Sequence, residues 1–133
     1  MAVGNPYESY QQNAVNTASR GELTLMLYNG CLKSIHLAKM AIAQKHIEAK
    51  NTNIQKAQSI VQELMVTLNM ELEVSKNMMA LYDYMNRRLI EANIKSDVAI
   101  LEEVEGFVVE FRDTWKQVIQ INRQNQFAQG GKV

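Results

Sequence analysis

The side chains that could carry acid, base or metal chemistry are few in this sequence, and their spacing does not bring them together. The only histidines are His36 and His46, and the only cysteine is Cys31. A separation of five residues is poor for placing Cys31 and His36 on one helix face. No Glu-x-x-His pair occurs, although helical bundles that hold a di-iron centre place this pair on facing helices. We therefore expect neither a metal centre nor another cofactor.

A run of acidic residues, Glu102, Glu103, Glu105 and Glu110, is the other candidate for chemistry. A charge run of this kind is usually a solvated helix face. Inward-pointing carboxylates would have to interrupt the apolar positions among them, and they do not. The sequence also lacks a glycine-rich phosphate loop, a nucleophile elbow and a cysteine with a base at helical spacing. These absences predict that the protein is not an enzyme.

Length and charge limit the remaining classes of protein. A chain of 133 residues suits one domain with a single hydrophobic core. Fourteen Lys and Arg balance fourteen Asp and Glu, so nothing favours binding to nucleic acid or to an anionic membrane. A single cysteine in an apolar run is typical of a reducing compartment. The sequence shows no N-terminal signal pattern and no stretch of about 18 apolar residues. We expect a cytoplasmic protein without membrane insertion.

Any binding surface must then be built from helices, because little in the chain interrupts helix formation. Pro6 is the only proline, and between residues 20 and 121 glycine occurs only at positions 21, 30 and 106. Apolar residues recur with alternating three- and four-residue steps, which is the spacing of bundle packing at crossing angles of about 20°. Three seams follow this spacing: Ile54, Ala57, Val61, Leu64 and Leu68; Met78, Tyr82, Met85, Leu89 and Ala92; and Leu101, Val104, Val108, Phe111, Trp115 and Val118.

Short breaks separate four helical segments. We expect these breaks near residues 45–46, 71–76 and 94–97, and connections this short make successive helices antiparallel. Ser19 and Glu22 fit a capping box at the start of the first helix, and Ser96 with Asp97 provides a cap for the last. The sequence predicts an all-α fold, an antiparallel up-down four-helix bundle over residues 19–121.

The two ends of the chain differ from the bundle. Residues 1–18 are polar but contain Tyr7 and Tyr10, and two aromatic residues in a polar segment indicate an N-terminal arm that docks on another surface. Residues 122–133 are polar, lack a helical period and contain Gly130 and Gly131. We expect this segment to be a flexible, disordered C-terminal tail.

The first helix is apolar over a wider arc than one core face needs. Its apolar residues from Leu23 to Ile42 cover roughly 200° of the circumference, whereas a surface helix needs somewhat over roughly 100°. Either this helix is the most buried of the four, or part of the arc binds a segment of a partner protein. Eight methionines favour the second reading slightly, because flexible thioethers suit surfaces that repack around a ligand. The candidate partner-binding residues are Tyr7, Tyr10, Leu23, Met26, Leu27 and Tyr28.

Several short motifs also occur in a distinctive order along nearly the whole chain. They are Asn5-Pro6-Tyr7-x-x-Tyr10-Gln11, Val15-Asn16-Thr17-Ala18, GELTLMLYNGCLKSI from Gly21, LYDYMNRRLIEAN from Leu81, Glu102-x-x-Glu105-Gly106 and Phe111-Arg112-x-x-Trp115. In this order and spacing the sequence resembles the flagellar secretion chaperone FliS family of Gram-positive bacteria. Arg20 departs from the family pattern, which usually has a proline just before Gly-Glu-Leu.

The resemblance implies a cytoplasmic four-helix bundle that binds newly made flagellin. The ligand would be the disordered C-terminal region of flagellin, which forms short helices as it wraps around the bundle. Binding would prevent premature polymerisation and keep flagellin competent for flagellar type III secretion. The resemblance also implies that Tyr7 and Tyr10 lie over a hydrophobic groove in the free chaperone and help to engage a component of the flagellar export gate when cargo is bound.

A second interpretation remains open at this point. A helical adaptor or a self-associating structural protein, for example a homodimer, would bury the same wide apolar arc. An enzyme built into the bundle core is the weakest interpretation, because the seams lack the polar residues that it would need. Mixing the protein with a flagellin C-terminal peptide separates the first two interpretations.

Overall fold

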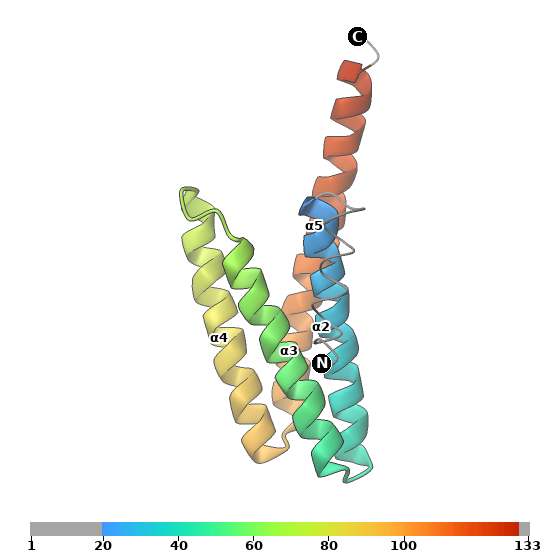
Figure 1. The fold of residues 1–133 in the computed structure, drawn as a ribbon, viewed down its shortest axis with the longest axis vertical. Coiled ribbons are helices and arrows are strands. Elements are labelled where there is room, and N and C mark those ends of the chain that lie inside the picture. The colour runs from blue at the N-terminus through green and yellow to red at the C-terminus, as the bar shows by residue number, and fades with distance from the viewer. Residues whose placement is uncertain (1–19, 131–133) are drawn as a thin grey trace, which may run out of the picture.

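The computed structural model describes residues 20–130, with side chains from 21 to 124, and consists of four long α-helices. They are α2 (Arg20–Ala43), α3 (Ile47–Thr67), α4 (Glu73–Lys95) and α5 (Val98–Gly130). Consecutive helices run antiparallel and are joined by short connections (Figure 1). The predicted all-α, up-down four-helix bundle is confirmed.

The helices form a ring in which each contacts two neighbours. Helix α2 packs against α3 and α5, and α4 packs against the same two helices, so α2 and α4 lie diagonally across the bundle. The α3–α4 pair leans away from the α2–α5 pair at one end of the molecule (Figure 1). This end, which holds the start of α2 and the connection between α3 and α4, is called the open end below, and the other is called the closed end.

The predicted seams form the hydrophobic core. All of their central positions are buried, including Ile54, Val61, Met85, Leu89 and Val104. Fully burying an aliphatic side chain of this size contributes about 1.5–3 kcal/mol to stability, which makes these seams the main source of the fold's free energy. The seam of α5 does not stay buried along its length. Phe111 and Trp115 are partly buried and Val118 is exposed, because α5 rises past the point where its neighbours diverge.

The wide apolar arc of the first helix has a structural explanation. Among the described residues, α2 buries more apolar side chains than any other helix, namely Leu23, Leu27, Tyr28, Cys31, Ile35, Ala38 and Ala41. The first of the two readings, that this helix is the most buried of the four, therefore accounts for most of the arc.

Two of the three predicted connections lie where the sequence placed them. After α2 the chain turns at Lys45, which has a positive φ of 61°, and α3 begins at Ile47. At the other connection Ser96 adopts the left-handed conformation that ends α4, with a φ of 51°. The carboxylate of Asp97 accepts a hydrogen bond from the Ala99 N–H at 2.9 Å and so caps α5. The predicted cap is thus provided by Asp97, while Ser96 belongs to the end of α4.

Two predicted boundaries differ from the structure. The second break covers residues 68–72, because Leu68 and Leu72 are extended, whereas residues 73–76 already belong to α4. Helix α5 continues to Gly130, although an irregular segment was expected from Asn122. Polar residues do not end a helix by themselves, and no proline or glycine occurs between Gly106 and Gly130. Ser19 of the predicted capping box lies outside the described residues.

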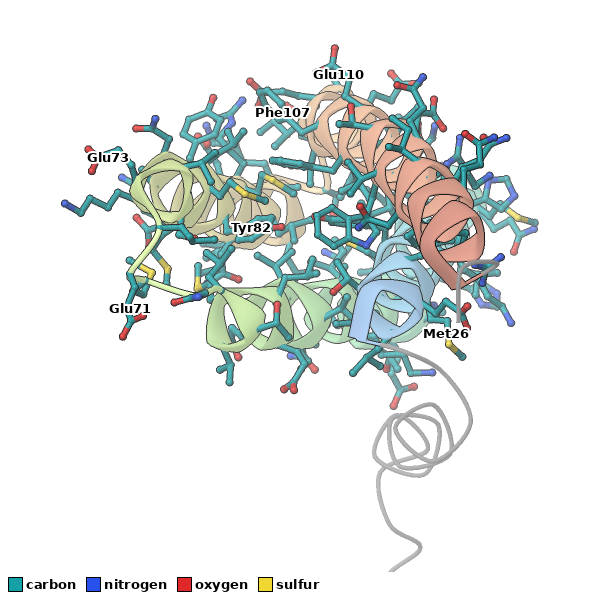
Figure 2. The ribbon with its side chains drawn as sticks, turned by 90° about the horizontal axis from the view of Figure 1, so that it is seen from above. Met26, Glu71, Glu73, Tyr82, Phe107 and Glu110 are labelled. Atoms are coloured by element: carbon teal, nitrogen blue, oxygen red, sulfur yellow. The ribbon has the colours of Figure 1, made fainter. Side chains whose placement is uncertain are left out.

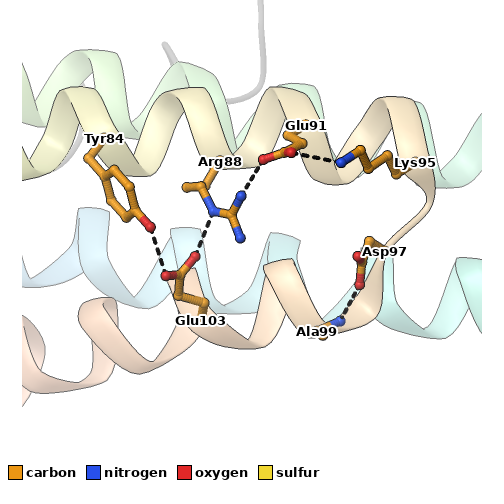
Figure 3. A network of polar contacts seen from close by, with 7 residues as sticks. All are labelled: Tyr84, Arg88, Glu91, Lys95, Asp97, Ala99 and Glu103. Atoms are coloured by element: carbon orange, nitrogen blue, oxygen red, sulfur yellow. Dashed lines mark hydrogen bonds and ion pairs between the residues drawn. The ribbon is translucent and has the colours of Figure 1, made fainter.

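Polar contacts hold the closed half of the bundle together. Lys50 is buried, and its Nζ donates to the Asn93 carbonyl oxygen and to Ser96 Oγ, both at 2.8 Å. A cation here complements the negative end of the α4 dipole. Glu103 of α5 accepts hydrogen bonds from Tyr84 Oη at 2.8 Å and from Arg88 Nε at 2.7 Å (Figure 3). The acidic run is therefore only partly a solvated face.

Candidate functional site

Half-buried apolar side chains gather at the open end of the bundle. They come from α3, α4 and α5 and pack against the core without being enclosed by it. We call this set the open-end surface, and its members are Met65, Leu68, Met78, Leu81, Phe111 and Trp115. Each of these six side chains is only partly buried and therefore partly accessible to solvent.

Three aromatic rings form the floor of this surface. The hydroxyl oxygens of Tyr28 and Tyr82 are 2.6 Å apart, and both residues are buried. Phe111 stacks on Tyr28 with a centroid separation of 5.7 Å and contacts Tyr82 in a tilted arrangement at 5.3 Å. Tyr82 lies between the helices when the bundle is viewed from above (Figure 2). Offset and tilted aromatic pairs of this kind stabilise a packed cluster.

Burial determines the electrostatics of this cluster. Desolvation raises the pKa of Tyr28, and the hydrogen bond between Tyr28 and Tyr82 offsets part of the rise. Desolvation also raises the pKa of Tyr82, and its neighbour Tyr28 adds to the effect. Both phenols therefore stay neutral, and the site offers apolar and aromatic contact without charge.

Trp115 fixes the beginning of α2 beside the open-end surface. Its indole Nε1 donates a hydrogen bond of 2.8 Å to the carbonyl oxygen of Gly21. Ile119, one turn further along α5, lies against the same glycine, where an added Cβ would meet its Cγ1 at 3.4 Å. Arg123 of α5 also pairs with Glu22. Residues on α5 thus set the direction in which the chain enters the bundle.

The residues predicted to bind a partner are distributed differently from the expectation. Leu27 and Tyr28 are each 1% exposed, and Leu23 is also in the core, so these three side chains are not on the surface of this structure. Met26 is partly exposed on the outside of α2, away from Tyr82 (Figure 2). Tyr7 and Tyr10 lie outside the described residues. Of the candidate set, Tyr28 stacks on Phe111 of the open-end surface.

Periodicity predicts that most of the open-end surface belongs to the core. Leu68, Met78, Phe111 and Trp115 occupy positions of the predicted seams. Their position near the ends of the seams was a usable signal, because seams at helix ends have fewer neighbours. Periodicity could not show that the helices diverge there.

The part of the chain that the structure describes was compared with the expectations for a metal centre and for a reactive cysteine. No group of His, Cys, Asp and Glu in residues 20–130 could hold a metal ion. Burial raises the pKa of the Cys31 thiol to about 12, which leaves it protonated and a poor nucleophile. Over the same residues, no helix has the length and apolarity that crossing a membrane would require.

A helical bundle with partly accessible apolar side chains is typical of proteins that bind other polypeptides. The family model described as "Flagellar protein FliS" matches residues 3–122. The chain is 60% identical to the flagellar secretion chaperone FliS of Bacillus subtilis over 98% of both chains. It is 36% identical to the proteins of the same name from Escherichia coli and Salmonella typhimurium, over 80% of this chain and 80% and 82% of theirs. The chain belongs to the FliS family of flagellar secretion chaperones.

Proposed function

We propose that this protein is a cytoplasmic export chaperone that binds the disordered C-terminal region of flagellin. Binding prevents premature polymerisation of flagellin and keeps it competent for flagellar type III secretion. The relatives' name, flagellar secretion chaperone, supports an export role. The structural observation that carries the proposal is the open-end surface, since a bundle needs such apolar area to hold an unfolded client.

The free energy that is needed to order a disordered client explains why the chaperone needs an apolar surface. Ordering a disordered segment on its host costs about 2–5 kcal/mol or more of the interaction energy. At about 25 cal/mol per Å², offsetting that cost requires about 80–200 Å² of buried apolar area before any net affinity remains. Met65, Met78 and Phe111 supply part of this area, and the two methionines can change rotamer to fit different client side chains.

The decisive experiment measures binding of a flagellin C-terminal peptide to the full chain by calorimetry. The variant Met78→Ser, in the open-end surface, should weaken binding, and its helical content should be checked by circular dichroism. Ile94→Ser is a matched control, because Ile94 is an exposed apolar residue on α4 near the closed end. Equal losses in both variants, or no binding to the native chain, would contradict the proposal.

A helical adaptor or a self-associating structural protein is the alternative function. A homodimer could also cover the open-end surface. Sedimentation of the free protein and of the peptide complex distinguishes the two. If the peptide does not bind and Met78→Ser converts a dimer to a monomer, self-association is the better description.

The chaperone role requires a second partner, a component of the flagellar export gate. We propose that Tyr7 and Tyr10 of the N-terminal arm take part in that contact and cover apolar surface when no client is bound. Pull-down with the export component should then depend on both tyrosines and on the presence of client. Nucleic acid and membrane are not expected partners, since the chain has no net charge to attract them.

A further inference from the structure

The connection between α3 and α4 carries a second apolar patch, which differs from the open-end surface because its side chains are well exposed. Val66, Met70, Leu72 and Val74 are 47 to 77% exposed and lie within nine residues of sequence. They make up four of the eleven large hydrophobic side chains that are exposed among the described residues. We call them the hairpin tip. Such a concentration at one end of a molecule is typical of an interaction site.

Acidic side chains are interleaved with these apolar residues. Glu71 and Glu73 are exposed, and both extend outward at the edge of the molecule (Figure 2). From residue 57 to residue 82 the only charged residues are Glu63, Glu71, Glu73 and Lys76. Lys76 Nζ lies 3.9 Å from a carboxylate oxygen of Glu73, with both side chains largely in solvent, so the pair is weak. The hairpin tip is therefore apolar with a net negative charge.

The negative charge of the hairpin tip favours some binding partners over others. Bacterial or other anionic membrane surfaces repel an acidic patch, because lipid recognition relies on Lys and Arg beside apolar residues. In a two-fold dimer built on this patch, Glu71 and Glu73 would face the same residues of the second copy, and like charges oppose that arrangement. A partner with an apolar centre and basic residues around it would not be repelled, because its positive charges attract Glu71 and Glu73.

We propose that the hairpin tip is a docking surface for a protein segment that presents an apolar face bordered by Lys or Arg. This site goes beyond client binding. Its residues are exposed around the α3–α4 connection, whereas those of the open-end surface pack against the core. The two sets share no side chain, so a chaperone with both has separate contacts for a client and for another protein.

The test uses the full chain and two designed amphipathic helical peptides. Both peptides carry the same Leu and Ile face, and one has Lys and Arg beside it while the other has Asp and Glu. Fluorescence anisotropy should show tighter binding of the basic peptide, by roughly 2- to 30-fold, the range for two exposed ion pairs. The double variant Glu71→Lys with Glu73→Lys should reverse this preference.

A second variant separates docking from folding. Leu72 is the residue before α4 and makes no side-chain cap hydrogen bond, so Leu72→Ser should preserve or improve the start of that helix. Combined with Val74→Ser, it should abolish peptide binding without lowering the melting temperature, and binding of the flagellin peptide should persist. Ile47→Ser with Ile94→Ser is the control, because these residues are exposed and apolar at the closed end.

Four results would overturn the proposal. The first is equal binding of the acidic and basic peptides, and the second is binding to phosphatidylglycerol vesicles that depends on Leu72. The third is self-association that the double serine variant abolishes. The fourth is peptide binding that occurs only after Tyr7 and Tyr10 are both changed to Ser, since the chain's own N-terminal segment would then be the occupant. If the native chain does not bind the flagellin peptide, that result contradicts the proposed chaperone function but leaves the proposal for the hairpin tip intact.

Discussion

The hydroxyl groups of Tyr28 and Tyr82 meet at 2.6 Å in the core, although their helices, α2 and α4, lie diagonally across the bundle. This hydrogen bond joins one of the two pairs of helices that lie diagonally across the bundle, the other pair being α3 and α5. Because both residues are buried, each hydroxyl depends on the other for a partner.

The hydroxyl pair predicts strongly non-additive mutations. Tyr28→Phe or Tyr82→Phe leaves one buried hydroxyl without its partner, and each should cost about 1–3 kcal/mol of stability. Replacing both hydroxyls removes the need for a partner, so the double variant should be about as stable as either single variant, or more so. Urea unfolding of the four proteins measures the coupling. A double variant that loses the sum of the single effects would show that the bond contributes little.

Trp115 should contribute to stability through both its ring and its N–H group. Truncating a fully buried aromatic costs about 3–5 kcal/mol, and since Trp115 is partly exposed we expect about half of that for Trp115→Ala. Trp115→Phe keeps a ring but loses the bond to Gly21, which should cost about 1 kcal/mol. Amide exchange should also become faster in the first turn of α2. If Trp115→Ala melts like the native protein, this contact does not hold the helix.

The stabilisation from the hydrogen bonds between Glu103 of α5 and Tyr84 and Arg88 of α4 should depend on pH. The hydrogen bond from Arg88, and after it that from Tyr84, lowers the pKa of Glu103 below its ordinary value. A carboxylate with a lower pKa in the folded state stabilises the fold above its unfolded-state pKa of about 4.3, and the contribution is lost as pH falls through the folded pKa.

Urea midpoints of the native protein and of Glu103→Gln should therefore differ near neutral pH and converge in acid. The exposed Glu110 provides the matched control, Glu110→Gln, because it lies on the outer side of the same helix (Figure 2). A constant difference between the native protein and Glu103→Gln at all pH values would contradict this assignment.

The N-terminal arm is expected to compete with the client for apolar surface. A tethered segment acts at an effective concentration of about millimolar, so even weak docking would cover the surface until a ligand with more buried area displaced it. Deleting residues 1–18 should raise binding of a hydrophobic dye and leave flagellin-peptide affinity equal or higher. Loss of peptide binding with the bundle still folded would show that the arm belongs to the binding surface. No change in either measurement would mean that its tyrosines contact nothing.

The last part of α5 should exchange its amide hydrogens faster than the bundle. The helix continues past the level at which α2 begins (Figure 1). Helical segments shorter than about 12–15 residues are marginal in water without packing. Hydrogen exchange followed by mass spectrometry should therefore show little protection after residue 121. Protection equal to that of Leu101 or Val108 would indicate a contact that stabilises this segment.

The helical class, the three seams and the approximate connections could be predicted from the sequence, because each depends on local spacing. When apolar residues recur at every third or fourth position, the α-helix is the regular structure that places them all on one side. Asp97 could be recognised as a cap because its partner, the Ala99 N–H, is two residues away. The ordered motifs also indicated the FliS family, which the comparisons with known proteins confirm.

Which apolar residues are accessible depends on how the four helices pack, and this could not be predicted from the sequence. Periodicity gives the direction of a side chain around its own helix, but not how many helices surround it or how steeply they diverge. Leu27 and Tyr28 are therefore in the core rather than on a binding surface, while Phe111 and Trp115 are partly accessible. Lys50 could not be predicted as a buried cation, because its partners at Asn93 and Ser96 are more than forty residues away in sequence. These properties arise from contacts between distant parts of the chain, and no local pattern encodes them.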